Sequence, residues 1–253
     1  MNSVVLGWPL VFAVVLLAVL ATLVTGLAGL GRWSQAGTAT VRAVAQLAVV
    51  SVLIGAVIKS LPLTAAFLLA MITVAAGTSA HRITGHLRWR AWWAGVAIAA
   101  GAIPPLAVLI LTGTLPASPA ALLPTGGILI GGAMTATSLA GRRVTEELIH
   151  HRGSYEAALS LGMTRRQSVD LVARPAAGLA LVPGLDQTRT VGLVTLPGAF
   201  IGMLLAGASP AQAGAVQLIV LVALLLTQSL AAACTLELIA AGLIPVGVTP
   251  LPA

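Results

Sequence analysis

The sequence predicts an all-α, polytopic helical membrane protein with about seven transmembrane helices and a cytoplasmic coupling-helix loop. Of the 253 residues, 58% are hydrophobic and only 8% are charged, and the mean hydropathy is +1.06. A soluble domain carries roughly 25% charged residues. Apolar runs of about 18 or more residues can cross a bilayer, and several such runs recur here. These runs are continuously apolar, whereas the strands of a membrane β-barrel would alternate apolar and polar residues.

The first four predicted spans are plain apolar runs within a single permease domain over residues 1–253. Pro9–Leu30 has no basic segment before it, so we expect a retained helix and no cleavable signal peptide. Arg42–Ile58, Pro62–Ala80 and Trp92–Leu111 follow. Tryptophans fall near the ends of these spans, where their amphipathic rings favour the headgroup region.

The fifth and seventh spans are predicted over Ala121–Ala140 and Ala213–Ala233. The fifth is rich in glycine and hydroxyl residues, which allow close helix packing and hydrogen bonds across an interface or a wet path. The single cysteine, Cys234, directly follows the seventh span and excludes an intrachain disulfide.

The sixth span, Thr190–Ala206, is predicted to be a broken helix. Proline removes an intrahelical hydrogen bond and glycine lowers stiffness. In lipid, the freed backbone groups need protein or water partners, so we expect this segment to lie beside a cavity. The predicted helix-break or gating residues are Pro183, Gly184, Pro197 and Gly198.

The basic residues predict the orientation. Apart from Lys59, they fall in alternate loops or at the inner ends of spans. The positive-inside rule then places the N-terminus outside and the C-terminus in the cytoplasm. This rule accounts for the net charge of +7 without a nucleic-acid partner. The longest polar segment, about residues 141–186, is predicted to be cytoplasmic.

Within that loop, the segment Glu156-Ala157-Ala158-Leu159-Ser160-Leu161-Gly162 predicts a short exposed helix. Ser154 is the expected N-cap, Gly162 the expected C-cap, and Thr164 the expected cap of the next helix. A two-turn helix presented to the cytoplasm has a suitable shape for entering a cleft on another protein.

This segment resembles the EAA loop of ABC-transporter permeases, and several further blocks resemble the permease subunit of the FetB-type (iron-export) ABC-transporter family. The blocks are Arg42-Ala43-Val44-Ala45-Gln46-Leu47, Gly132-Ala133-Met134-Thr135-Ala136-Thr137-Ser138-Leu139, Tyr155 to Thr164, Arg189-Thr190-Val191-Gly192-Leu193-Val194-Thr195-Leu196-Pro197-Gly198 and Gly207-Ala208-Ser209-Pro210. The resemblance implies a homodimer of permease subunits in the bacterial plasma (inner) membrane. It also implies a separate ATPase subunit and a metal ion or metal complex as cargo. Bacterial relatives are linked to iron efflux and plant relatives to aluminium tolerance.

The resemblance implies that the short helix couples the permease to the ATPase. The residues it assigns to coupling are Glu156, Ala157, Ala158, Gly162, Arg165 and Arg166. The two arginines would pair with acidic groups on the ATPase, or else contact lipid headgroups. The alternative for the whole segment is an ordinary loop helix. Arg174 departs from the EAA pattern, where leucine is usual.

A translocation pathway is predicted among hydroxyl, thioether and amide side chains in the spans. The candidates are Arg42, Gln46, Met134, Thr135, Thr137, Ser138, Thr195 and Met203. The alternative is plain helix packing, with Arg42 snorkelling to the interface. Iron favours carboxylate or imidazole ligands, and none can be placed at the membrane centre, so the metal site stays unknown. Glu146 and His150 share a helical face, but an exposed charged helix is usually only solvated.

The function predicted from these patterns is a permease subunit that exports iron or another metal ion, without an enzymatic site. The sequence lacks a Gly-x4-Gly-Lys-[Ser/Thr] phosphate loop, so ATP and Mg would belong to the partner ATPase and this chain would bind no cofactor. The alternatives are an ABC importer permease for a small solute and a stand-alone ion-coupled transporter. The spans lack the series of buried acidic or histidine side chains expected of proton coupling, which argues against the stand-alone transporter.

Overall fold

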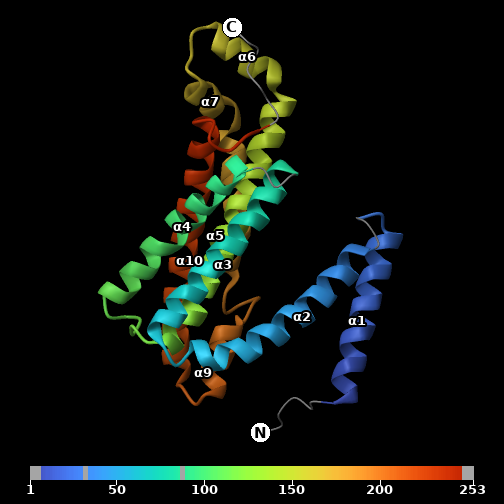
Figure 1. Ribbon diagram of the computed structural model, residues 1–253, viewed down its shortest axis with the longest axis vertical. Helices are drawn as coiled ribbons and strands as arrows, with labels where there is room; N and C mark the ends of the chain where they lie inside the picture. Colours follow the sequence, from blue (N-terminus) through green and yellow to red (C-terminus); the bar gives the residue numbers. More distant parts are fainter. Residues whose placement is uncertain (1–6, 31–33, 86–88, 247–253) are drawn as a thin grey trace. The chain divides into compact units, whose positions relative to one another are not determined.

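The computed structural model describes residues 7–30, 34–85 and 89–246. The regular structure there is helical, apart from one isolated bridge between Val191 and Thr195. The chain divides into two compact units, residues 1–59 and residues 60–253. Figure 1 shows the helices of both units. The described residues include seven helical segments long and apolar enough to cross a membrane, which confirms the predicted fold class.

The first unit is a pair of apolar helices, α1 (Trp8–Leu27) and α2 (Ser34–Val57). The most apolar 18-residue stretch of α1 has a mean hydropathy of 2.8, and the helix has no buried residue. With about 1.5 Å of rise per residue, its 20 residues span about 30 Å, close to the thickness of the bilayer core. Helices that are apolar on every side are typical of lipid-surrounded spans.

The second unit is built around four long helices, α3 (Leu61–Thr84), α4 (Ala94–Leu111), α5 (Pro119–His150) and α10 (Pro210–Ala240). The short helix η1 (Trp89–Trp93) precedes α4. Small residues let these helices approach closely, as expected between helices in lipid. The hydroxyls of Ser79 and Ser138 lie 2.9 Å apart across the α3–α5 interface.

Gly101 provides a sharp test of this packing. A Cβ at Gly101 would lie 2.8 Å from Ala231 Cβ and 2.8 Å from the Thr227 carbonyl oxygen, whereas a Cβ at Gly131 would meet nothing within 4 Å. We therefore expect Gly101→Ala to lower the free energy of unfolding by about 1–3 kcal/mol. Gly131→Ala should leave it unchanged or raise it by less than about 1 kcal/mol. Thermal unfolding in detergent measures both, and equal effects would contradict the packing.

Five shorter helices connect α5 to α10. They are α6 (Arg152–Ser160), α7 (Arg165–Gly178), η2 (Leu179–Leu181), α8 (Val182–Thr190) and α9 (Gly198–Leu205). In Figure 1, α6 and α9 lie at opposite ends of the second unit. The α9 helix packs against α10, and the Ser209–Gln212 capping box starts α10 beside it. The two ends of the second unit therefore carry different short helices.

The prediction of a sixth span over Thr190–Ala206 is wrong. The candidate crossing instead covers Arg165–Thr190, through α7, η2 and α8. The next helix, α9, has only 8 residues. Its length is therefore about 12 Å, which is too short to cross a bilayer core of about 30 Å. The backbone turns at Gly192, whose φ is 82°, and Pro197 then precedes α9 as its N-cap.

The predicted polar loop of about residues 141–186 is largely helical, and its cytoplasmic place stays a prediction. The α5 helix continues to His150, and the candidate crossing begins at Arg165. The segment between them is short and consists of α6 with its flanking turns. The hydropathy of the sequence did not reveal this candidate crossing, because the charged residues in the first turns of α7 lower the mean hydropathy of the segment and the apolar residues follow only afterwards.

Candidate functional site

The α6 helix lies against the bundle through one face and leaves the other face open. Tyr155 is 2% exposed and Ala158 is 3% exposed, and Tyr155 belongs to a core cluster with Val144, Leu148 and Ile239. Glu156 is half-buried, and Ala157 is exposed. Burying a whole tyrosine ring is a strong anchor for a helix of 9 residues. Ala158, predicted to seat against an ATPase, is buried within this chain, and its part in coupling stays a prediction.

The turn after α6 presents an exposed apolar side chain at a fixed place. Leu161 is 85% exposed, and Gly162 follows with φ 87°, a left-handed conformation that favours glycine. The helix ends at Ser160 with Leu161 as its C-cap, so the predicted C-cap Gly162 lies one residue further along, in the left-handed turn. We call Ala157, Leu161 and Gly162 the docking tip.

The turn after α6 leads directly into α7, and hydrogen bonds at the N-terminus of α7 fix the far end of this turn. The Thr164 hydroxyl accepts a hydrogen bond from Gln167 N, and the Gln167 side chain accepts one from Thr164 N. The predicted Thr164 cap is thus confirmed, as a capping box. The predicted Ser154 cap is wrong, because α6 begins at Arg152 with His151 as its N-cap. The docking tip therefore sits between two helix ends with defined backbone geometry.

Arginines on α7 tie this helix to the end of α10. Arg166 Nη2 lies 2.6 Å from Glu237 Oε2, and Arg174 Nη2 lies 3.6 Å from Glu237 Oε1 and 2.8 Å from Asp170 Oδ1. Arg165 donates to the Ile239 carbonyl oxygen at 3.4 Å, where a cation favours the negative end of the α10 dipole. Arg165 and Arg166, predicted to meet an ATPase, thus have partners inside the chain.

Glu156 is also paired within its own helix. Arg152 Nε donates to Glu156 Oε1 at 2.7 Å across one turn of α6. Exposed pairs of this kind contribute little stability, so they leave the carboxylate free to exchange partners. The arrangement offers no nucleophile or acid–base pair at the docking tip. It offers a rigid apolar projection flanked by charge, which suits protein recognition.

The predicted pathway residues on α5 divide between two environments. Thr137 and Ser138 are buried, Thr135 is exposed, and Met134 is half-buried. The Thr135 hydroxyl bonds the Gly131 carbonyl oxygen in its own helix. Ser138 pairs with Ser79, which indicates packing. Thr137 Oγ1 has no hydrogen-bond partner among the described residues.

The remaining pathway candidates lie on other elements. Thr195 is exposed in the turn after α8, and Met203 is half-buried on α9. Arg42 and Gln46 are exposed on α2 within the first unit. Their role in translocation stays a prediction.

The helix-break residues occupy two places in the second unit. Pro183 starts α8 after the 3-10 turn η2, and Gly184 is buried. A Cβ on Gly184 would collide with the side-chain amide of Gln228, so this glycine permits close contact between α8 and α10. Pro197 and Gly198 begin α9. Gating by these residues stays a prediction.

Sequence reasoning missed three buried polar residues on α10. Gln217 and Gln228 are nearly buried and Thr227 is fully buried. The side-chain oxygens of all three have no hydrogen-bond partner within the part of the chain that the structure describes. The signal was available, since glutamines are conspicuous in a predicted apolar span. The partners of Glu237 on α7 lie far from it in sequence, so no local spacing predicts them.

The histidine and glutamate cluster at the end of α5 is an exposed set of local pairs. His151 Nε2 lies 3.2 Å from Glu147 Oε1, and His150 Nδ1 lies 2.8 Å from the Glu146 carbonyl oxygen. Among the described residues, no group of three or more histidine, cysteine, aspartate or glutamate side chains is placed to hold a metal ion.

Comparison with known proteins identifies a family and several relatives. The family described as "Uncharacterised protein family (UPF0014)" matches residues 8–244. The chain is 36% identical over 151 residues to "UPF0014 membrane protein STAR2" of Oryza sativa subsp. japonica, covering 60% of this chain and 53% of that protein. It is 35% identical over 151 residues to "Protein ALUMINUM SENSITIVE 3" of Arabidopsis thaliana, covering 60% and 55%.

A bacterial relative carries a name that refers to transport. The chain is 38% identical over 135 residues to "Probable iron export permease protein FetB" of Escherichia coli (strain K12), covering 53% of this chain and 52% of that protein. The matched region thus spans about half the length of these curated relatives. No solved structure matches the chain.

Proposed function

The chain belongs to the UPF0014 family of membrane proteins, and from that premise we propose that it is the permease subunit of an ABC transporter. In this proposal it moves a metal ion or metal complex out of a bacterial cell across the plasma membrane. A relative named a probable iron export permease supports the cargo and the direction. The N-terminus would lie outside and the C-terminus in the cytoplasm, as the distribution of basic residues favours.

The observation that carries the proposal is the anchored α6 helix. Tyr155 fixes it to the bundle, while Leu161 projects with 85% of its surface exposed. An exposed leucine at a well-defined helix end suits an apolar cleft on a partner. In this proposal the docking tip enters the separate ATPase subunit, and Glu156 exchanges its bond with Arg152 for contacts there.

The internal ion pairs support a route for the motion. Arg166 and Arg174 of α7 meet Glu237 of α10, so a displacement of α6 and α7 would be passed to a membrane-spanning helix. Such exposed pairs are individually weak, which lets α7 shift without a large energetic cost. ATP and Mg would be bound by the ATPase subunit, and a second copy of the permease would complete the pathway. This chain would have no catalytic site of its own.

The function is tested by reconstituting the chain in inside-out vesicles with a P-loop ATPase subunit from the same organism. We expect ATP to drive radioactive iron into the vesicle lumen, the direction that corresponds to export. An ATPase variant that lacks the phosphate-loop lysine is the control, and it should give no accumulation. ATP-driven movement of iron out of such vesicles would overturn export, and movement without any ATPase would overturn the ABC assignment.

A further inference from the structure

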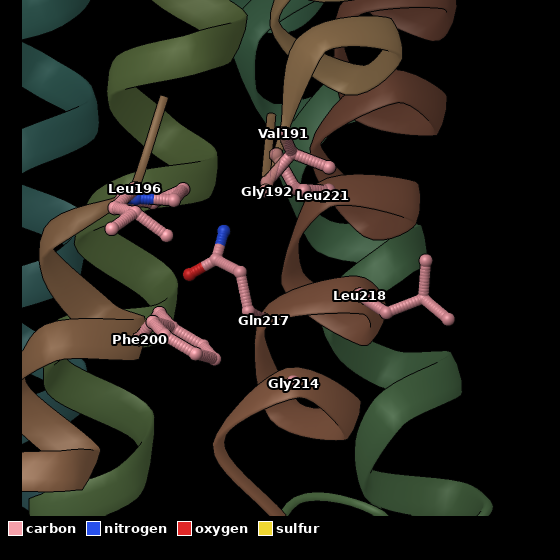
Figure 2. Close-up of a pocket in the computed structure, with 9 residues that line it drawn as sticks. Val191, Gly192, Leu196, Phe200, Gly214, Gln217, Leu218 and Leu221 are labelled. Carbon is pink, nitrogen blue, oxygen red and sulfur yellow. The ribbon is translucent and has the colours of Figure 1, made fainter. Parts of the chain in front are cut away.

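A cavity of about 260 Å³ lies between the segment after α8 and the first half of α10. Figure 2 shows Gln217 at its centre, with Leu196 and Phe200 on one side and Val191 on the other. The residues that line it are Val191, Gly192, Leu196, Pro197, Phe200, Gly214, Gln217, Leu218 and Leu221. The walls are therefore apolar, with one amide among them.

Gln217 is not explained by packing inside the chain. It is 5% exposed, and its Oε1 atom has no hydrogen-bond partner among the described residues. A buried acceptor without a donor is unfavourable, because it has lost its water and gained nothing in return. A leucine would fill the same space without that cost. Gln217 lines the cavity, so a small rotation of its side chain would bring the unsatisfied oxygen to a donor carried by a bound molecule.

The cavity restricts the chemistry of that molecule. A bare metal cation needs several oxygen, nitrogen or sulfur ligands, and apolar walls disfavour a charge. An apolar cavity of about 150 Å³ holds benzene, so this larger cavity accommodates an aromatic ring with a few substituents. A hydroxyl on that ring would supply the donor that Gln217 lacks.

We infer that this cavity is a binding site for a small, uncharged, largely apolar solute whose hydroxyl donates to Gln217 Oε1. The solute can be a free phenol-like molecule or the organic shell of a neutral metal complex, since both present the same chemistry. A role for this site in holding transported cargo depends on the proposed function. Binding itself requires only this chain, so it is measured without the ATPase.

The test compares two probes, 4-fluorophenol and its methyl ether 4-fluoroanisole, by fluorine NMR titration of the purified full chain in lipid nanodiscs. Only the phenol can donate a hydrogen bond. Gln217→Leu should weaken binding of the phenol by about five-fold, the net effect of one hydrogen bond, and should not weaken binding of the ether. Gln217→Leu should fold at least as well as the wild type, because it removes an unpaired buried oxygen.

Two further variants make the test specific. Gln228→Leu removes another amide on α10 whose oxygen has no hydrogen-bond partner among the described residues and which does not line this cavity. It should leave both affinities unchanged. Gly214 lines the cavity, and a Cβ there would meet nothing within 4 Å. Gly214→Leu should therefore fill the cavity and abolish binding of both probes while the chain stays folded.

Three results would overturn the inference. They are an absence of saturable phenol binding above empty nanodiscs, a phenol affinity that survives Gln217→Leu, and binding that persists in Gly214→Leu. A cavity filled by lipid acyl chains would give the first of these. A chain that binds the phenol as expected but assembles with no ATPase would preserve this site and contradict the proposed function instead.

Discussion

Leu161→Glu is expected to weaken association with the ATPase subunit by at least about 30-fold and to abolish ATP-driven transport. Truncation of a central apolar anchor at an interface commonly costs about 2 kcal/mol or more, and a carboxylate adds the penalty of a buried, unpaired charge. Leu161 is 85% exposed, so the change should not disturb folding of the chain itself. Titration of the purified subunits by calorimetry measures the affinity.

Leu111→Glu is the matched control for this substitution. Leu111 is also 85% exposed, and it ends α4 next to the loop that leads into the start of α5. Because α5 runs from that loop to α6, Leu111 lies at the end of the second unit opposite the docking tip. The control should bind the ATPase with wild-type affinity. If both variants lose affinity equally, Leu161 has no special place in docking.

Tyr155→Ala is expected to release α6 from the bundle. Removing a buried aromatic side chain typically costs about 3–5 kcal/mol, and Tyr155 is 2% exposed within its core cluster. An isolated helix shorter than about 12 residues is marginal in water, so α6 depends on this anchor. Hydrogen exchange should report at least about a 100-fold loss of protection for the α6 amides, with smaller changes in α10.

Tyr155→Phe distinguishes the contribution of the aromatic ring from that of the hydroxyl group. It retains the apolar surface and should keep the protection of α6 close to that of the wild type. ATPase association should follow the same order, with Tyr155→Ala impaired and Tyr155→Phe intact. Unchanged exchange of α6 in Tyr155→Ala would show that the ring does not anchor this helix.

Much of the fold followed from hydrophobicity alone, because lipid requires long helices whose backbone groups bond internally. The segment Arg165–Thr190 escaped this reasoning. Asp170 and Arg174 lower its hydropathy near the start, but they pair with each other one turn apart. Conversely, Thr190–Ala206 is apolar enough to suggest a span. The backbone nevertheless turns at Gly192, and a new helix begins after Pro197.

The candidate site was predictable in its local part. The turn at Gly162 and the Thr164 cap could be predicted because turn and capping preferences depend on neighbouring residues. The inward face of α6, with Ala158 buried, and the contact of Arg166 with Glu237 depend on helices distant in sequence. The Gln217 cavity lies beside the segment after α8, as expected for that proline- and glycine-rich stretch, but no spacing along the chain specifies Gln217 as its polar residue.

Photo-crosslinking from the docking tip tests the central claim most directly. A photoreactive side chain is placed at position 161, or at position 111 as the control, and the chain is co-expressed with a P-loop ATPase subunit from the same organism. We expect a crosslink to the ATPase from position 161 that changes in yield when ATP is bound, and none from position 111. A functional transporter that forms no crosslink at position 161, or forms equal crosslinks at both positions, would contradict docking through α6.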